Sequence, residues 1–314
     1  MLKIILMGAL QSSANISANL LTHFPLTRIW GAGTGNNTIN SAGIARSDSR
    51  NKKPAGKVWL VGAGPGDPEL VSVKALRVIR SADVLVYDRL VCPELIAESP
   101  RDAIRIDVGK RPGHHPVPQG RIEEILCAHA AQGRTVVRLK GGDPFIFGRG
   151  GEEMLSIKSA GIAVEIIPGI TAAAACAATS GFPLTHRDIA DKVTLVTAHY
   201  KDERDRTDWR ALASDGSGTL VFYMGLSSAN SIQQQLIKNG LDPQTPAALV
   251  ENGSTAVQRT VYCSLNTLSE TVIEKQLISP CLIVVGKVVA LAGSTGETLQ
   301  QSQLLNKKRI NYSI

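Results

Sequence analysis

The sequence contains few aromatic residues and no long apolar run. Aromatic side chains make up only 4% of the 314 residues, too few for the stacked platforms on which proteins bind single-stranded nucleic acid. A membrane-spanning helix needs about 20 consecutive apolar residues. The best C-terminal candidate, residues 282–291, is shorter and contains Lys287. We therefore expect a protein that binds neither nucleic acid nor a membrane.

Cysteine pairs with the spacing of metal or redox sites are also missing. The five cysteines are odd in number and far apart, without a C-x-x-C pair or the histidine pattern of a zinc site. Three of them, Cys176, Cys263 and Cys281, lie in apolar or strand-like stretches, where we expect buried thiols. This usage indicates a reducing compartment, because disulfide frameworks belong to oxidising ones.

Acidic residues are scarce at both ends of the chain, which accounts for its formal net charge of +7. Residues 1–56 contain six basic residues and one acidic residue, and residues 293–314 contain three and one. The body between them contains 25 of each sign. A body without net charge lacks the basic surface that a nucleic-acid-binding domain needs.

Residues 1–56 have the composition of an extension. They are rich in Ser, Asn, Gly and Thr and contain no acid before Asp48. Three interpretations stay open: a disordered extension, an organelle transit peptide, or a secretory signal built on the apolar residues 4–10. We expect a cytoplasmic protein, or an organellar one if the extension is a transit peptide. Residues 293–314 are expected to form a polar tail.

From Lys57 onward, short β-branched runs alternate with helical stretches. Strands are predicted over residues 58–61, 84–88, 104–108, 135–139 and 163–167, and helices over 69–81, 121–131, 152–160 and 170–180. This alternation is typical of a parallel sheet covered on both faces, here an N-terminal α/β domain over residues 57–185. Each strand ends in Gly, Pro or Asp, so the candidate loops gather at the carboxyl edge, where open α/β sheets bind ligands.

A second series of strands and helices follows. Strands are predicted over residues 193–197, 219–223, 247–251, 260–263 and 282–285, helices over 228–239 and 265–275, and a charged loop over 201–210. We expect a second α/β domain over residues 186–292. The two series do not repeat at a fixed period, which excludes a repeat protein.

The first glycine loop only partly matches a dinucleotide-binding fingerprint. Its glycines are Gly62, Gly64 and Gly66, so the third glycine is one position early and Asp67 follows it. A carboxylate there is unfavourable for a pyrophosphate, which needs backbone N–H groups. Asp88, at the end of the second strand, does resemble the acid that binds ribose. An NAD(P)-dependent dehydrogenase therefore stays open as an alternative.

A second loop, RLKGGDPFIFGRGG at residues 138–151, is the most unusual segment. Its two glycines, Gly141 and Gly142, let a ligand approach the backbone closely. Asp143 adds a carboxylate at a strand end, and the aromatic residues Phe145 and Phe147 provide apolar walls. This combination suits a ligand that carries positive charge better than a triphosphate.

A third loop, residues 108–119, contains Lys110, Arg111, His114 and His115 among prolines and glycines. A solvated loop, an anion-binding loop and a metal site are the interpretations that stay open. Adjacent histidines rarely chelate one ion and no third ligand is evident, so we expect no metal. Residues 105–149 hold eight basic and four acidic residues, an excess that favours a polyanionic substrate.

Together these segments resemble the tetrapyrrole methylase family, in particular its uroporphyrinogen-III C-methyltransferases. The matching motifs are VGAGPGDP at 61–68, VYDRLV at 86–91, VGKR at 108–111, RLKGGDPFIFGRGG at 138–151, PGITA at 168–172, GFPLTHR at 181–187, FYMG at 222–225 and VENG at 250–253. They occur in order from about residue 58 to residue 291. Each glycine loop alone is a weak signal, but the combination is highly specific.

The resemblance implies two α/β domains, the second with a mixed sheet, and a cofactor between them. That cofactor is S-adenosylmethionine, and the family's reaction methylates C2 and C7 of uroporphyrinogen III to give precorrin-2 for sirohaem or cobalamin. By position, the expected cofactor-binding residues are Pro65, Gly141, Gly142, Asp143, Ile146, Thr171, Ala172, Met224 and Gly253. The family's proton acceptor matches Asp88 and its proton donor matches Lys110. Members are typically homodimers.

The residues of these loops suit the methyl transfer and the proton removal that this reaction requires. Methyl transfer mainly needs aligned reactants, and the methylated macrocycle must then lose a proton to a nearby base. Asp88 suits that role, although it could instead pair with Arg89 or cap a helix. The substrate has eight carboxylates, which we expect to be bound by the cations of this region: Lys110, Arg111, Arg138, Lys140 and Arg149. A methylase of a later corrin precursor and a non-catalytic tetrapyrrole-binding protein stay open beside the dehydrogenase.

Overall fold

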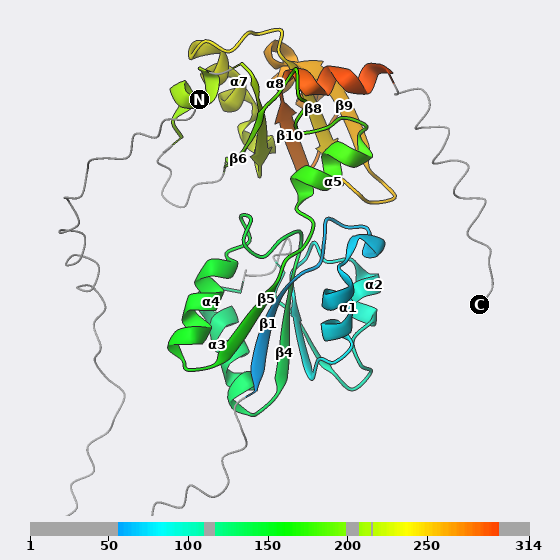
Figure 1. Ribbon diagram of the computed structural model, residues 1–314, viewed down its shortest axis with the longest axis vertical. Coiled ribbons are helices and arrows are strands. Elements are labelled where there is room, and N and C mark those ends of the chain that lie inside the picture. Colours follow the sequence, from blue (N-terminus) through cyan, green and yellow to red (C-terminus); the bar gives the residue numbers. More distant parts are fainter. Residues whose placement is uncertain (1–55, 110–116, 199–206, 215, 295–314) are drawn as a thin grey trace, which may run out of the picture. The chain divides into compact units, whose positions relative to one another are not determined.

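Two five-stranded sheets form the framework of the computed structural model (Figure 1). The structure describes residues 56–109, 117–198, 207–214 and 216–294. Residues 1–55 of the expected N-terminal extension, residues 295–314 of the expected polar tail, Lys110 and both histidines of the third loop lie outside the described residues. No helix in the described part of the chain is both long and apolar enough to cross a membrane.

The first sheet is entirely parallel, as the alternating pattern predicts. Its strands are β1 (Lys57–Gly62), β2 (Val84–Tyr87), β3 (Ile104–Asp107), β4 (Thr135–Lys140) and β5 (Ala163–Ile167), in the order β3-β2-β4-β1-β5. The central strands β1, β2 and β4 are rich in buried apolar residues because both of their faces are covered, and β4 also contains the buried cations Arg138 and Lys140.

Helices cover both faces of this sheet (Figure 1). On one face α1 (Val73–Ile79) and α2 (Pro93–Ala97) pack through Ile79 and Leu95, and on the other α3 (Gln119–Ala131) and α4 (Gly150–Ser159) pack through Leu126 and Ile157. The helix expected over 69–81 is divided into a 3₁₀ turn, η1 (Pro68–Leu70), and α1. Ser72 causes the division, because its hydroxyl accepts from the N–H of Ala75 and starts a new helix.

The second sheet is mixed, as expected. Its strands are β6 (Lys192–Thr197), β7 (Gly218–Tyr223), β8 (Pro246–Glu251), β9 (Arg259–Ser264) and β10 (Cys281–Val285), in the order β6-β7-β10-β8-β9. Only β6 and β7 pair in parallel among these strands. One face packs against α7 (Ala229–Lys238) and α8 (Leu268–Glu274). A short helix that was not predicted, α6 (Trp209–Ala213), begins within the last residues of the expected charged loop.

The other face of the second sheet packs against α5 (Ala172–Thr179) and the 3₁₀ helix η4 (Lys287–Ser294). Ala173 and Cys176 of α5 share a core with Val221 and Val250. The boundary expected after residue 185 assigns α5 to the first domain, but its side chains pack with the second. Cys176 and Cys281 are buried free thiols, as expected, and burial raises the pKa of each to about 12.

Cys263 differs from that expectation. Its thiol is only half-buried, because it lies on the edge strand β9, although burial still raises its pKa.

Candidate functional site

The loops that follow β1 and β4 are joined by two backbone hydrogen bonds. The N–H of Gly64 donates to the carbonyl of Gly142 over 3.2 Å, and the N–H of Gly142 donates to that of Gly64 over 2.6 Å. Both residues have positive φ, 76° and 66°, which glycine adopts without steric cost. The two glycines therefore hold the segment that contains Pro65 beside the one that contains Gly141.

The loop after β5 is packed directly against these two. A methyl group on Gly169 would lie 2.2 Å from the carbonyl oxygen of Gly142 and 2.8 Å from Cα of Gly62. No side chain fits between the three backbones. The glycines of the first loop thus allow close packing of strand-end loops. Asp67 accepts from the N–H of Glu69 over 2.8 Å and caps η1.

Asp143 links two of the loops through its carboxylate. Its Oδ1 accepts from the N–H of Phe145 over 2.8 Å, and its Oδ2 accepts from the N–H of Gly169 over 3.0 Å. Both carboxylate oxygens therefore accept backbone hydrogen bonds that fix the conformation of these loops. Beside them Phe145 and Phe147 are exposed, as expected for apolar walls at a ligand site.

Tyr223, at the end of β7, connects the second sheet to these loops. Its hydroxyl lies 2.6 Å from Thr171 Oγ1 and accepts from the N–H of Ala173 over 2.9 Å, and its ring centroid is 5.0 Å from that of Phe147. Met224 follows with an exposed side chain and φ of 54°. Tyr223 is not among the residues expected from the sequence; its only signal there is its position beside Met224 in the FYMG motif.

The loop after β8 completes the cluster. A methyl group on Gly253 would lie 2.2 Å from Sγ of Cys176 on α5, and one on Gly66 would lie 2.8 Å from Cγ2 of Thr255. Five segments are thus linked by direct contacts: those that follow β1, β4, β5, β7 and β8. All nine residues expected to bind the cofactor lie in these segments: Pro65, Gly141, Gly142, Asp143, Ile146, Thr171, Ala172, Met224 and Gly253.

Asp88 follows β2 and pairs with two cations of β4. Its Oδ1 accepts from Nη2 of Arg138 over 2.5 Å, and its Oδ2 lies 3.8 Å from Nζ of Lys140. These cations, and not the neighbouring Arg89, are its ion-pair partners in the described part of the chain. One third of the Asp88 side chain is exposed, so the carboxylate is both held in orientation and accessible.

Beneath Asp88 lies the fully buried carboxylate of Glu153 on α4. Its Oε1 accepts from Nε of Arg138, Nζ of Lys140 and Nε2 of Gln119, each over 3.1 Å. Its Oε2 has no hydrogen-bond partner among the described residues. Burial and the charge of Arg138 lower the pKa of Lys140, while the carboxylates of Asp88 and Glu153 oppose that shift.

This network corrects one expectation from the sequence. Arg138 and Lys140 were expected to meet the carboxylates of a substrate, but both are buried and bound to carboxylates of the chain itself. Arg149 is half-exposed and pairs with Glu152 through two contacts of 2.9 and 2.6 Å. The remaining expected anion ligands, Lys110 and Arg111, lie outside the described residues.

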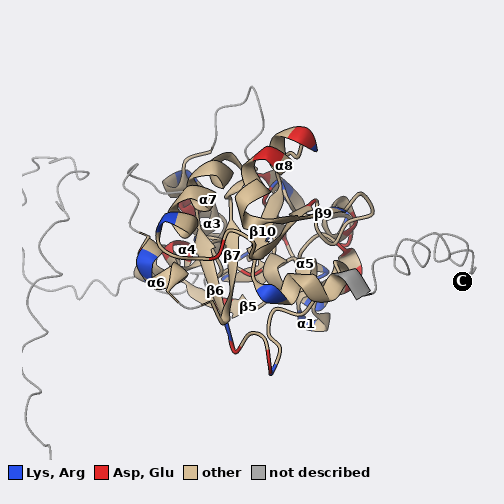
Figure 2. Cartoon of the chain, turned by 90° about the horizontal axis from the view of Figure 1, so that it is seen from above, with Lys and Arg blue, Asp and Glu red and all other residues tan. Residues whose placement is uncertain are grey.

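Charges elsewhere on the described body are dispersed. Figure 2 shows basic and acidic positions scattered over the helices and loops of both sheets, in agreement with the neutral charge count of the body. Within the described ranges, no group of three His, Cys, Asp or Glu side chains lies close enough together to hold a metal ion.

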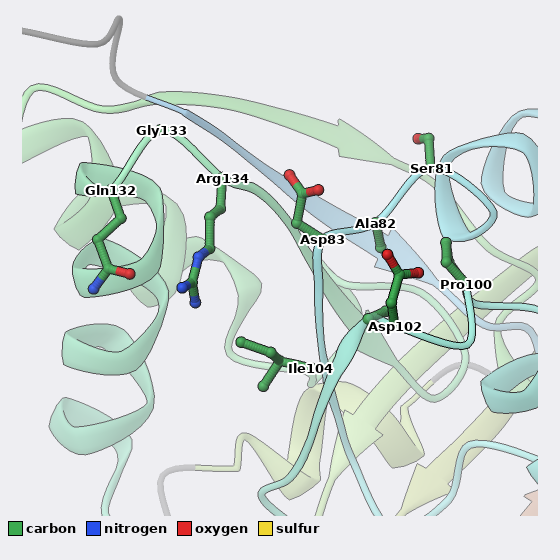
Figure 3. A pocket seen from close by; sticks show the side chains of 10 residues that line it. Ser81, Ala82, Asp83, Pro100, Asp102, Ile104, Gln132, Gly133 and Arg134 are labelled. Carbon is green, nitrogen blue, oxygen red and sulfur yellow. The ribbon is translucent and has the colours of Figure 1, made fainter.

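A polar cavity of about 660 Å³ lies at the amino-terminal ends of the strands of the first sheet, opposite the glycine loops (Figure 3). It is lined by Asp83, Ile104 and Arg134, which stand at the amino ends of β2, β3 and β4. Asp83 accepts from the N–H of Thr135, and Arg134 donates to Nδ1 of His129. Because all strands of the sheet are parallel, this cavity is separated from the glycine loops by the length of the strands.

Residues 57–269 match the family model of the tetrapyrrole (corrin/porphyrin) methylases. The chain is 56% identical to a siroheme synthase of Edwardsiella ictaluri (strain 93-146) over 236 residues, which are 75% of this chain and 50% of that protein. It spans about half the length of the siroheme synthases that it matches.

Two further similarities cover nearly all of the protein compared. A uroporphyrinogen-III C-methyltransferase of Bacillus subtilis (strain 168) is 50% identical over 235 residues, 74% of this chain and 91% of that protein. A crystal structure of a uroporphyrin-III C-methyltransferase of Thermus thermophilus with S-adenyl homocysteine is 40% identical, with a TM-score of 0.64 over 74% of this chain and 93% of that one.

Proposed function

This chain belongs to the tetrapyrrole (corrin/porphyrin) methylases, and we propose that it transfers methyl groups from S-adenosylmethionine to C2 and C7 of uroporphyrinogen III. The product would be precorrin-2, for sirohaem or cobalamin. The observation that carries this proposal is the cluster of five strand-end loops that holds every expected cofactor residue. Similarity to the Bacillus subtilis and Thermus thermophilus methyltransferases supports the choice of substrate and cofactor.

The residues of the cluster fit a sulfonium cofactor. Gly141 and Gly142 present partly exposed backbone without a side chain, and Phe145 and Met224 offer half-exposed apolar surface. S-adenosylmethionine, when bound, supplies an electrophilic methyl group. The chain itself would hold the adenosyl and methionyl parts through residues 141–143, 171–172 and 253, with Pro65, Ile146 and Met224 beside them.

Asp88 is proposed to remove the proton that the methylated macrocycle must lose. Arg138 holds its Oδ1, and the partial exposure of the side chain leaves the carboxylate within reach of a substrate. A positioned base of this kind contributes typically 10²- to 10⁴-fold to a rate. Lys110, outside the described residues, is proposed to return a proton.

Substitution of Asp88 by asparagine is expected to slow turnover about 100-fold while leaving the affinity for S-adenosylhomocysteine unchanged. Asparagine preserves the acceptor for Arg138 but is not basic. Steady-state rates and isothermal titration calorimetry would measure the two quantities. Turnover at the wild-type rate would remove Asp88 as the base.

Substitution of Asp143 by alanine is expected to weaken S-adenosylhomocysteine binding by about 10- to 100-fold, because it removes two hydrogen bonds to a carboxylate. The asparagine variant keeps one oxygen acceptor, so its affinity should be intermediate. An alanine variant with the wild-type dissociation constant would show that Asp143 does not serve the cofactor site.

The reaction is tested by mass spectrometry after anaerobic incubation with uroporphyrinogen III and S-adenosylmethionine. We expect a tetrapyrrole heavier by two methyl groups. An unchanged tetrapyrrole, from protein that binds S-adenosylhomocysteine, would move the proposal to a later corrin precursor. Thermal stabilisation by NAD, without stabilisation by S-adenosylhomocysteine, would favour the dehydrogenase instead.

The proposal also includes a homodimer in the cytoplasm and independence from metal ions. Largely exposed apolar side chains on the second domain, among them Val257 and Ile273, are suited to a contact between copies. Sedimentation equilibrium would measure the assembly, and a sole monomeric species would contradict this part. Dialysis against a chelator is expected to leave activity unchanged.

A further inference from the structure

Tyr223 touches three separate segments proposed to hold the cofactor. Its ring packs on Phe147, which follows Asp143 and Ile146; its hydroxyl bonds Thr171; and its own backbone continues into Met224. These segments come from the loop after β4, the start of α5 and the end of β7. A single side chain thus ties together elements of both sheets.

The Tyr223 hydroxyl uses its donor and its acceptor together. It accepts from the N–H of Ala173 in the first turn of α5 and can donate to Thr171 Oγ1. Burial raises the pKa of this phenol, which keeps the proton on the oxygen. Thr171 makes no capping hydrogen bond to α5 through its own side chain, so the tyrosine supplies the acceptor that a cap residue normally provides.

The segments that Tyr223 joins contain unusual backbone conformations. Phe147 and Met224 have φ of 52° and 54°, in the left-handed region that residues other than glycine rarely occupy. Such conformations persist only where surrounding contacts enforce them. The ring contact to Phe147 and the anchored residue before Met224 are contacts of this kind.

We propose that Tyr223 is a positioning residue for S-adenosylmethionine, which holds Phe147, Thr171 and Met224 in the arrangement that binds the cofactor. Tyr223 acts through these neighbours. The inference rests on the proposed function of the site. It predicts that loss of the hydroxyl alone loosens the cofactor site, even though the ring and the fold are retained.

The chain offers a closely matched control at the other end of the same helix. Tyr262 on β9 donates its hydroxyl to the carbonyl of Ser180, the C-cap residue of α5, over 2.7 Å. Tyr223 and Tyr262 therefore hold the two ends of α5 with the same chemical group. Only the first of these ends contains residues proposed to bind the cofactor.

Isothermal titration calorimetry with S-adenosylhomocysteine tests the inference on the full chain. We expect Tyr223→Phe to raise the dissociation constant about 5- to 30-fold, and Tyr262→Phe to change it less than about twofold. Thermal unfolding of both variants without ligand should show similar small losses. In turnover, Tyr223→Phe should raise the KM for S-adenosylmethionine with little change in the KM for the tetrapyrrole.

A double-mutant cycle tests whether the hydrogen bond between the Tyr223 and Thr171 hydroxyls itself supports cofactor binding, as distinct from a general loosening of the site. In a Thr171→Val background, where the Thr171 hydroxyl is already lost, Tyr223→Phe should weaken binding less than it does in the wild type. Equal losses from Tyr223→Phe and Tyr262→Phe, or no loss from the former, would overturn the inference alone. Wild-type protein that fails to bind S-adenosylhomocysteine would overturn the proposed function, and the inference with it.

Discussion

Replacement of Glu153 by leucine is expected to lower the free energy of unfolding by about 3 to 5 kcal/mol, the usual loss when one partner of a buried ion pair is removed. Glu153 is fully buried and its Oε1 accepts from both Arg138 and Lys140. Leucine has a similar volume, so packing is largely preserved. Two buried cations would then share Asp88 alone. Urea denaturation followed by circular dichroism would measure the loss.

A second carboxylate in the first domain provides the control. Glu165 on β5 also pairs with two cations, Lys57 and Lys74, but it is exposed to solvent. Exposed pairs contribute little, so Glu165→Leu should leave the urea midpoint nearly unchanged. If Glu153→Leu proved as mild as Glu165→Leu, the network beneath Asp88 would not be a structural element.

The Glu153 prediction has a pH dependence with a definite sign. The pKa of Lys140 is lowered in the folded state, so between that value and the ordinary value of 10.5 the unfolded chain binds more protons and stability rises with pH. Loss of the Glu153 charge, as in Glu153→Gln, lowers this pKa further. The stability difference between wild type and variant should therefore shrink as the pH approaches 10.5. A constant difference would show that Lys140 does not respond to Glu153.

Gly169→Ala is expected to destabilise the protein by about 3 kcal/mol, near the upper end of the range for overpacked sites. Its methyl group would meet the carbonyl oxygen of Gly142 and Cα of Gly62, and backbone atoms cannot change rotamer to make room. The loop would have to move, and the hydrogen bond from Gly169 to Asp143 would move with it. S-adenosylhomocysteine binding should therefore weaken in the same variant.

Gly120→Ala is the matched control for this substitution. Gly120 lies in the first turn of α3, where an added methyl group meets no atom within 4 Å. Alanine is favoured over glycine in a helix by about 0.5 to 1 kcal/mol, so this variant should be slightly more stable than the wild type. If Gly169→Ala were as stable as the wild type, the loops after β1, β4 and β5 could move apart without a loss of folding free energy, which would contradict this prediction.

The strands were predictable because each is a short run rich in β-branched or apolar residues, and those of the first sheet end at or next to Gly, Pro or Asp. The expected bounds of β5, residues 163–167, agree with the structure, and the other strands differ by one residue at one or both ends. The helix α2 escaped prediction, because five residues are too few to show a helical period. The place of α5 was also not predictable, since an alanine-rich helix does not indicate which sheet it covers.

The partners in the site were harder to predict than its members. Counting charge along the chain assigned Arg138 and Lys140 to a substrate, because their partners Asp88 and Glu153 belong to other elements. Only the strand order, which places β2 beside β4, and the packing of α4 bring these four side chains together. Tyr223 escaped for the same reason: its contacts lie on segments about 50 and 80 residues away along the chain.

The order of strands in the first sheet has a consequence for how the protein is made. β1 leaves the ribosome before the other strands, yet Lys57 at its start pairs with Thr135 on one side and Ala163 on the other. Such non-local parallel pairing forms slowly. During synthesis the apolar strand β1 remains unpaired until β4 has emerged from the ribosome. Throughout that interval the nascent chain is exposed to aggregation, so its soluble yield should respond to the rate of elongation and to chaperones.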